Sequence, residues 1–283
     1  MFLINSYVYT SFDGFNLNDY ASDSPILALS LRRINTAYTG PIVRLRRSSD
    51  NAESDFGSGL PMGDFLNYTA IDAWAGGSTV TIATWYDQSG SGRHLTQPTA
   101  SRQPQLSSGA TTGRAVKFSG ASDNHLAIDL STQNFFSNGP AFSIHHATDN
   151  QDNGFCSNMS VSATRDVPGQ TTYFRVNRYS TNCRISWRGV QYQPTGIPTT
   201  NGNEYLYYNH DGSNINVDID TSQVFTTPNT SATAAGGDVF NLGADATTHE
   251  WDGYTYELII FDSSQVTSDS DDIRDDIMTT YNI

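Results

Sequence analysis

From about residue 114 to residue 262, the sequence is a succession of short strand-like segments separated by turn residues. These segments are rich in β-branched and aromatic residues and recur at the spacing expected of a β-sandwich. In residues 214–219 polar and apolar side chains alternate, so one face of that strand would enter a core and the other would meet water. Asp211 and Gly212, just before it, form a hairpin signal. We therefore predict an all-β fold, with strands at 114–118, 125–130, 142–146, 154–163, 171–179, 183–187, 204–209, 214–219, 239–242 and 251–261.

A distinctive stretch before this region joins one more strand to a tight turn. Residues 78–86 alternate β-branched and aromatic residues, which is typical of a half-buried strand. Residues 87–92 interrupt it, because Asp and Ser side chains bond nearby backbone and Gly90 and Gly92 can adopt positive φ. The residues that this turn would present, as a binding site or as a structural corner, are Asp87, Gln88, Arg93 and His94.

Short helices are expected on both sides of the β-rich region. Pro25, behind a capping acid or serine and ahead of apolar residues at roughly helical spacing, predicts an amphipathic helix over residues 21–35. One or two helical turns are predicted over residues 67–74. A closing helix is predicted over residues 268–281, where acids in the first turns complement the helix dipole.

The chain is long enough for one large sandwich domain. Residues 2–9 are mostly apolar and aromatic, as in an opening strand or arm, and no internal repeat or linker divides the rest. We therefore assign residues 1–20 to an N-terminal strand or arm and residues 21–283 to a single β-sandwich domain.

The charge balance narrows the classes of partner. The net charge of −14 argues against nucleic acid and anionic lipid as partners. The first residues carry neither a basic region nor a small-residue cleavage site, so we expect no signal peptide and folding in a cytoplasm. The two cysteines, Cys156 and Cys183, do not form a disulfide framework, and buried thiols are favoured over a single bridge.

Arginines and carboxylates are concentrated before residue 56. Because arginine binds carboxylates with two parallel hydrogen bonds, we favour an internal salt-bridge cluster over a basic patch for an anionic glycan or phosphate. The cluster consists of Arg32, Arg33, Arg44, Arg46, Arg47, Asp50, Glu53 and Asp55. We expect Asp87 and Arg93 to tie the turn to this block. The predicted structural corner then comprises Arg44, Arg46, Asp50, Glu53, Asp87, Arg93 and His94.

Metal and cofactor signals are weak. His145 and His146 are adjacent, and neighbours in a strand point to opposite faces, so no transition-metal site is predicted. No nucleophile elbow, P-loop or dinucleotide fingerprint is present. We predict no cofactor, with Ca²⁺ as the alternative because aspartate oxygens suit it. The aspartates concerned are Asp218, Asp220 and Asp238, or Asp245 with Asp252.

Aromatic residues are frequent in the later strands and their loops. Such rings stack on sugars in some proteins, although core packing and subunit contacts are commoner uses. The glycan-binding candidates are Trp187, Tyr205, Tyr207, Asp245 and Trp251.

Five blocks in the N-terminal half are the most specific part of the sequence: 29–34, 37–41, 43–53, 85–90 and 93–97. They resemble the N-terminal part of the catalytic domain of α-L-arabinofuranosidase B. They are equally similar to a set of phage virion proteins that carry the same blocks ahead of a concanavalin-like jelly roll. Residues 241–261 resemble the last strands of laminin-G-like and concanavalin-like domains. The resemblance implies a concanavalin-like β-sandwich, a jelly roll with short N-terminal helices and a C-terminal helix.

The same resemblance bears on catalysis. Retaining glycosidases need two carboxyl groups roughly 5 Å apart, a nucleophile and an acid/base. The family's acid/base is an Asp in a glycine-rich segment before the final strands, which Asp245 matches. Its nucleophile is a Glu in a cysteine-containing block, and residues 153–159 contain Cys156 without a Glu or an adjacent second Cys. No glutamate stands at that position, since the four present are Glu53, Glu204, Glu250 and Glu257.

The missing nucleophile leads us to predict a non-enzymatic structural component of a phage virion. It would decorate the head or tail or form a fibre-like appendage, with host-surface polysaccharide as a candidate ligand. We expect synthesis in the host cytoplasm, a virion location and other virion proteins as partners. We also expect a homo-oligomer, since virion parts are symmetric, and assume a trimer. The alternatives are a glycoside hydrolase of α-L-arabinofuranosidase type with Asp245 as acid/base, and a free-standing lectin.

Overall fold

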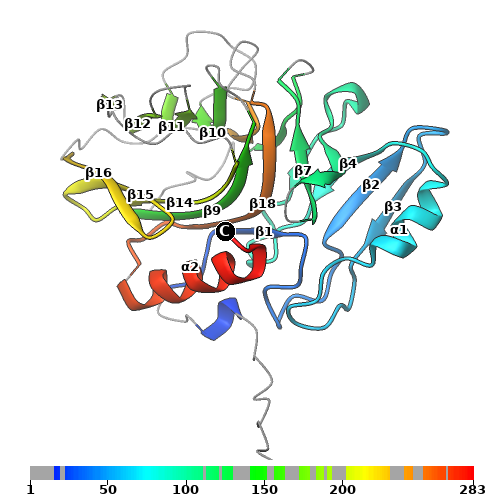
Figure 1. Ribbon diagram of the computed structural model, residues 1–283, viewed down its shortest axis with the longest axis horizontal. Helices are drawn as coiled ribbons and strands as arrows, with labels where there is room; N and C mark the ends of the chain where they lie inside the picture. Colours follow the sequence, from blue (N-terminus) through cyan, green and yellow to red (C-terminus); the bar gives the residue numbers. More distant parts are fainter. Residues whose placement is uncertain are drawn as a thin grey trace, which may run out of the picture.

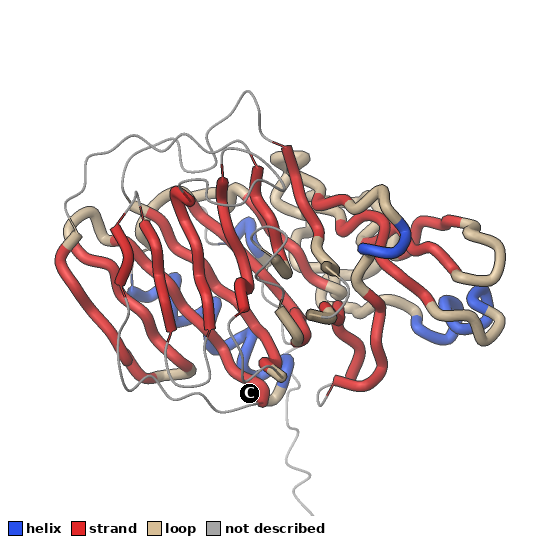
Figure 2. Tube along the Cα trace, turned by 90° about the horizontal axis from the view of Figure 1, so that it is seen from above, coloured by secondary structure: helices blue, strands red, loops and turns tan. Residues whose placement is uncertain are grey.

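Two stacked layers of antiparallel strands form the centre of the computed structural model (Figure 1, Figure 2). A helix lies under the outer face of one layer, and a smaller lobe of strands extends to one side (Figure 1). The structure describes residues 16–19, 23–110, 113–120, 123–129, 141–151, 156–162, 172–178, 183–187, 190–192, 202–229, 239–244, 251–265 and 267–283.

The layer next to the helix, here called the helix-covered sheet, is built around three strands of nine residues each. One of these three, β18 (Gly253–Phe261), pairs along one edge with two shorter strands, which follow one another along that edge. In order across the sheet the strands are β16 (Ser222–Pro228), β15 (Asn214–Ile219), β14 (Gly202–His210), β9 (Phe142–Asn150), β18 (Gly253–Phe261), and then β7 (Gly113–Phe118) and β1 (Leu27–Ser30).

The opposite layer, here called the open sheet, packs on the inner face of the helix-covered sheet (Figure 1). In order its strands are β13 (Val190–Tyr192), β12 (Cys183–Trp187), β11 (Thr172–Arg178), β10 (Cys156–Ser162), β17 (Val239–Leu242), β8 (Leu126–Asp129) and β5 (Leu95–Thr96).

The side lobe is continuous with both layers, because β4 pairs with β5 and β6 pairs with β7. Its elements are β2 (Val43–Arg47), β3 (Glu53–Phe56), β4 (Val80–Trp85), β6 (Gln105–Ala110) and α1 (Tyr68–Ala75). Two short 3-10 helices, η1 (Leu17–Asp19) and η2 (Ala100–Arg102), complete the described elements along with α2 (Thr267–Tyr281).

Alternation along β14 shows how the layers are joined. Leu206 and Tyr208 point into the core between the two sheets, whereas Tyr205 and Tyr207 face α2. On the helix side, Ile273, Ile277 and Tyr281 lie four residues apart and are all buried against the sheet. Burying such a side chain contributes about 1.5–3 kcal/mol, so the outer face of β14 depends on α2.

The predicted fold class is confirmed, since the described chain is a β-sandwich with a C-terminal helix. The closing helix is present as α2, and α1 matches the predicted helical turns. The side chain of Asn67 caps α1 by accepting a hydrogen bond from the Ala70 N–H at 3.0 Å. Asp211 stabilises the predicted hairpin by accepting from the Ser213 and Asn214 N–H groups at 2.8 and 2.7 Å.

The predicted helix over residues 21–35 is wrong. Within that range Leu27–Ser30 forms β1, whose four residues are all buried and pair with β18. A strand buried on both faces reads as a continuous apolar run, and its spacing does not distinguish it from a buried helix. The sequence also failed to indicate β6 and β16, whose polar residues resemble those of a loop.

The register of the open sheet separates the two cysteines. Cys156 on β10 and Cys183 on β12 both lie opposite Arg178 on the intervening β11. Strands are about 4.8 Å apart, which puts the two Cα atoms about 10 Å apart, whereas a disulfide needs roughly 4.4–6.8 Å. The backbone therefore favours two thiols over a bridge.

Residues 2–9, the predicted opening strand or arm, lie outside the described residues. Among the helices that the structure describes, none combines the length and the apolar character needed to cross a bilayer.

Candidate functional site

The turn after β4 is held by one aspartate. Asp87 is 1% exposed, and its two carboxylate oxygens accept from the N–H groups of Ala28, Ser89 and Arg93 at 2.8–3.0 Å and from the Ser89 hydroxyl at 2.8 Å. A carboxylate with four donors has no free lone pair aimed at a substrate. The turn is thus a structural corner.

The expected tie between this turn and the arginine block runs through other residues. Asp87 and Arg93 both bind the β1 side, since Arg93 donates to the Ile26 carbonyl at 3.2 Å. The link to the block is the Tyr86 hydroxyl, which donates to Asp55 at 2.9 Å. His94 packs edge-on against Tyr86 and accepts from the Asp87 N–H at 3.1 Å, and burial lowers its pKa.

Three arginines of β2 pair with the carboxylates predicted from the sequence. Arg44 holds Asp55 with two bonds of 2.8 and 2.9 Å, Arg46 reaches Glu53 at 2.5 Å, and Arg47 holds Asp50 at 2.7 and 2.9 Å. The hydrogen bonds from Arg47 lower the pKa of Asp50 to about 2, and those from Arg44 lower the pKa of Asp55. These guanidinium groups are already neutralised, which disfavours a patch for anionic ligands.

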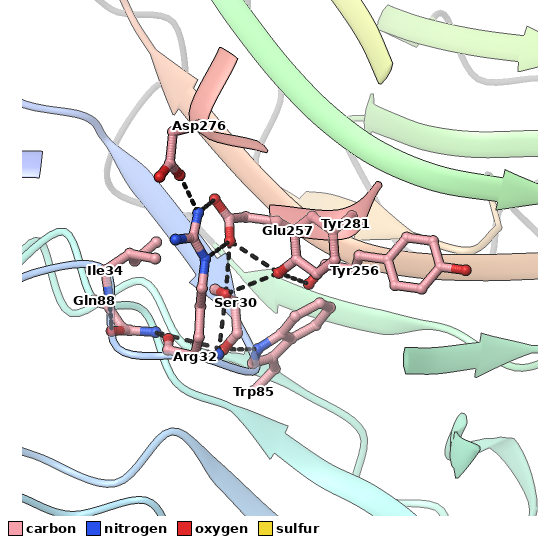
Figure 3. Close-up of polar contacts among 9 residues, drawn as sticks. All are labelled: Ser30, Arg32, Ile34, Trp85, Gln88, Tyr256, Glu257, Asp276 and Tyr281. Carbon is pink, nitrogen blue, oxygen red and sulfur yellow. Dashed lines mark hydrogen bonds and ion pairs between the residues drawn. The ribbon is translucent and has the colours of Figure 1, made fainter. Parts of the chain in front are cut away.

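Arg32 and Arg33 do not join those pairs. Arg33 donates to the carbonyl groups of Gly40 and Gly57 at 3.2 and 2.8 Å. Arg32 is 3% exposed and binds Glu257 of β18 with two bonds of 3.0 and 3.1 Å, as well as Asp276 of α2 (Figure 3). One arginine next to β1 therefore ties together elements more than 200 residues apart in the chain.

Glu257 is the centre of this buried network. One of its oxygens accepts from Arg32, and the other accepts from Arg32, from the Ser30 hydroxyl at 2.8 Å and from the Tyr281 hydroxyl at 3.0 Å. Burial by itself would lower the pKa of Arg32, but the Glu257 and Asp276 carboxylates raise it well above its usual value. Burial and the charge of Glu257 raise the pKa of Tyr281. The charged and hydroxyl groups of this network bind one another, so its role is structural.

Two residues from the stretch that joins β4 to the turn, Trp85 and Gln88, also support the segment that carries Ser30 and Arg32 (Figure 3). The Trp85 indole donates to the Ser30 carbonyl at 3.1 Å, and the Gln88 amide donates to the Arg32 carbonyl at 2.8 Å and accepts from the Ile34 N–H at 3.1 Å. Sequence reasoning missed this network. The one available signal was a lone charge, Glu257, inside a strand of otherwise apolar and aromatic residues.

The aromatic glycan-binding candidates do not share one face. Trp187 is fully buried between the sheets against Phe142, and Trp251 is fully buried against Phe118. A ring with no exposed surface does not stack on a sugar. Tyr205 and Tyr207 are also buried, but on the outer face of β14, where they line a pocket beside α2.

Asp245 lies outside the described residues, but the positions on either side of its segment are well defined. Gly243, which follows β17, has φ +97°, and a Cβ there would clash with the Phe118 ring. Its carbonyl accepts from the Trp251 N–H at 3.0 Å. The segment that contains Asp245 therefore starts and ends at one anchored point beside the central strand of the open sheet.

Three of the four glutamates are described. Glu53 is ion-paired at the surface, and Glu257 is saturated in the buried network. Glu204 is 2% exposed at the start of β14. Glu250 lies outside the described residues, as do Asp152 and Asp166, two aspartates that could replace the missing nucleophilic glutamate.

His145 and His146 lie on opposite faces of β9. Nδ1 of His145 lies 2.6 Å from the Tyr205 hydroxyl on the α2 side, and Nε2 of His146 lies 3.1 Å from the Thr255 hydroxyl. Burial lowers the pKa of each ring to about 3. Among the described residues, no three His, Cys, Asp or Glu side chains converge on a metal position. Of the calcium candidates, Asp218 and Asp220 line the pocket beside α2, while Asp238 and Asp245 are not described.

Comparison with known proteins points to one family. A family model described as "Alpha-L-arabinofuranosidase B, catalytic" matches residues 20–183, more than half of the chain. A probable α-L-arabinofuranosidase B from Aspergillus terreus is 42% identical over 66 residues, and an α-L-arabinofuranosidase from Hypocrea jecorina is 44% identical over 69 residues. Each match covers 23% of this chain and 13% of the relative. The chain thus aligns with only a small part of these curated relatives.

Solved structures agree on the fold. An arabinofuranosidase complexed with arabinofuranosyl-α-1,2-xylobiose superposes with a TM-score of 0.73 at 16% identity, covering 94% of this chain and 65% of that one. A GH54 α-L-arabinofuranosidase soaked with a cyclic sulfate inhibitor gives a TM-score of 0.75 at 15% identity, covering 94% and 64%. A Trypanosoma rangeli sialidase in complex with sialic acid gives 0.51 at 11% identity over 68% of this chain and 31% of that one.

The hypotheses of a non-enzymatic phage component and a virion location are therefore wrong. The matching family model is that of a catalytic domain, and the curated relatives named above are fungal enzymes. The resemblance to α-L-arabinofuranosidase B was the correct half of the sequence interpretation. This chain belongs to the α-L-arabinofuranosidase B catalytic family.

Proposed function

We propose that this protein is a glycoside hydrolase that cleaves α-L-arabinofuranosidic bonds. The observation that carries the proposal is the match of a catalytic-domain family model to residues 20–183. The described fold supports it, because the same sandwich extends over 94% of the chain in an arabinofuranosidase complexed with an arabinofuranosyl oligosaccharide. The chain aligns with a minor part of its curated relatives.

In this proposal Asp245 is the acid/base. A carboxylic acid in that role protonates the leaving oxygen and later activates water, while a second carboxylate attacks the sugar from about 5 Å away. The anchoring of Gly243 and Trp251 would hold both ends of the Asp245 segment, which limits how far the carboxyl group can move.

The partner carboxylate is constrained by elimination among the described residues. Glu53 and Glu257 are committed to arginine, whereas Glu204 is 2% exposed on β14. The nucleophile is then Glu204, Glu250 or an aspartate outside the described residues, such as Asp152 or Asp166. We expect a mechanism-based arabinofuranoside mimic to label such a residue, as read by peptide mapping. A label on Glu53 or Glu257 would contradict this assignment.

The activity test uses an aryl α-L-arabinofuranoside. We expect the purified chain to release the aryl alcohol and Asp245→Asn to lower kcat about 10²- to 10⁴-fold, which is the usual contribution of general acid–base catalysis. Asp252→Asn is the matched control, seven residues away and half-buried, and it should keep activity. Absence of turnover in the unaltered chain, with glycan binding retained, would instead support a lectin.

Homo-oligomer formation, the lack of a cofactor with Ca²⁺ as the alternative, and the lack of a nucleic-acid partner stay predictions from the sequence.

A further inference from the structure

A polar pocket lies on the outer face of the helix-covered sheet, between β14, β15 and the first half of α2. Its volume is about 180 Å³. Thr267, Ser270, Asp271 and Arg274 follow the i, i+3, i+4, i+7 spacing of one helix face, so they line one side of the pocket. The opposite side comes from the outward-facing residues of β14 and β15.

Several buried polar atoms that line this pocket have no partner within the protein. They are Oδ1 of Asp218, Oδ1 of Asn209, and both the Oε1 and Nε2 atoms of Gln265. Gln265 is only 6% exposed and Asn209 only 9%. A buried polar group left unmatched is expensive, and such groups in folded proteins bind either a ligand or ordered water.

The neighbouring polar groups are already occupied. The Tyr205 hydroxyl is bonded to His145, and the Tyr207 hydroxyl accepts from Nδ2 of Asn209 at 2.8 Å. Arg274 donates to Asp271 at 2.6 Å and to Asp275 at 2.9 Å. The lining atoms without a protein partner are therefore the three acceptor oxygens of Asp218, Asn209 and Gln265 and the amide donor of Gln265. These four atoms are called the open groups below.

The open groups define the chemistry of the occupant. Three acceptors call for a ligand with several donors, and the Gln265 amide donor calls for an acceptor as well. Hydroxyl groups do both. An anion would meet the carboxylates of Asp218, Asp220 and Asp271, and a cation could not accept a hydrogen bond from the Gln265 amide. A neutral polyol avoids both conflicts.

We propose that this pocket binds one neutral polyol of monosaccharide size, at a site separate from the Asp245 region. The inference does not depend on the proposed hydrolase activity, because the open sheet and β17 lie on the other side of the helix-covered sheet from α2 (Figure 1). The two tyrosine rings that line the pocket, Tyr205 and Tyr207, are buried, so hydrogen bonds carry the binding and a Kd on the order of 1 mM is expected.

The test measures binding of L-arabinose, D-xylose, D-glucose and myo-inositol to the full chain by ligand-observed NMR and calorimetry. We expect at least one of these probes to bind, and Gln265→Met and Asp218→Asn to weaken that binding about tenfold or more. Asp272→Asn, on the exposed side of the same helix, is the matched control and should leave Kd unchanged. Asp245→Asn should also leave it unchanged, which separates this site from the catalytic region.

Thermal unfolding without ligand guards against a folding artefact. Gln265→Met removes unmatched polar atoms at nearly constant shape, so Tm should stay the same or rise. Unaltered binding in both pocket variants, loss of binding in Asp245→Asn alone, or no binding of any probe to the unaltered chain would each overturn the proposal.

Discussion

Glu257 is a fully buried carboxylate in the middle of an otherwise apolar and aromatic strand, and it is tolerated because arginine, serine and tyrosine surround it. Breaking a buried ion pair from one side leaves the other charge without compensation. At the scale of single residues, the stability of this chain therefore depends more on Arg32 than on the several arginines at the surface of β2.

Substitution of Arg32 measures that dependence. Arg32→Met should lower the free energy of unfolding by about 3–5 kcal/mol, since it strands the Glu257 carboxylate. Arg44→Met removes a comparable two-bond pair with Asp55 at the surface and should cost less than about 1 kcal/mol. Urea unfolding measures the free energy of unfolding of both variants. An equal decrease in the two would show that the buried pair stabilises the fold no more than the surface pair does.

The two buried histidines predict a pH dependence of stability. Burial lowers the pKa of His145 and His146 to about 3, so the unfolded chain binds more protons than the folded chain between about pH 6.5 and 3. Their contribution is complete above pH 6.5 and is lost as the pH falls, at up to about 1.4 kcal/mol per pH unit for each ring. Denaturant unfolding across this range should show a shallower slope in His146→Gln than in the unaltered chain. An unchanged slope would mean that the carboxylates dominate.

At the scale of elements, the end of β17 is sterically constrained at Gly243. The left-handed backbone at Gly243 and its contact with Phe118 leave no room for a side chain. Because this end of β17 frames the segment that contains Asp245, its geometry connects the fold to the proposed chemistry.

Gly243→Ala tests that constraint against Gly90→Ala. Both glycines have φ above +90°, but a Cβ at Gly90 would meet no atom within 4 Å. Gly90→Ala should cost only the backbone strain of about 1–3 kcal/mol, and Gly243→Ala should add overpacking of about 1–3 kcal/mol. Thermal unfolding measures the difference. Equal Tm values would indicate that the Phe118 ring moves aside without penalty.

At the scale of the whole molecule, the strand order of the open sheet decides whether the two cysteines can form a disulfide. The open-sheet register keeps Cys156 and Cys183 about 10 Å apart. Thiol titration of the denatured chain should therefore count two free thiols, and a reducing agent should leave Tm unchanged. A single linked peptide in a non-reducing digest would contradict the register.

Local patterns in the sequence were sufficient for the elements whose signals are local. The alternation of polar and apolar residues predicted β4, β14 and β15, and the Asp211 turn predicted the hairpin between β14 and β15. The acidic residues of the first turns predicted α2. The blocks at 43–53 and 85–90 also indicated the family. These features depend on neighbours within a few residues, and such neighbours are visible in the sequence.

Only the tertiary structure decided the rest, because the deciding partners are distant in the chain. Leu27–Ser30 is a strand because β18, more than 220 residues later, offers a free edge. Trp187 and Trp251 belong to the core because two sheets close over them. The pocket beside α2 exists because that helix packs back on β14, leaving Gln265 and Asp218 buried without partners. Burial and pairing at such separations depend on the closed fold, which no short stretch of sequence contains.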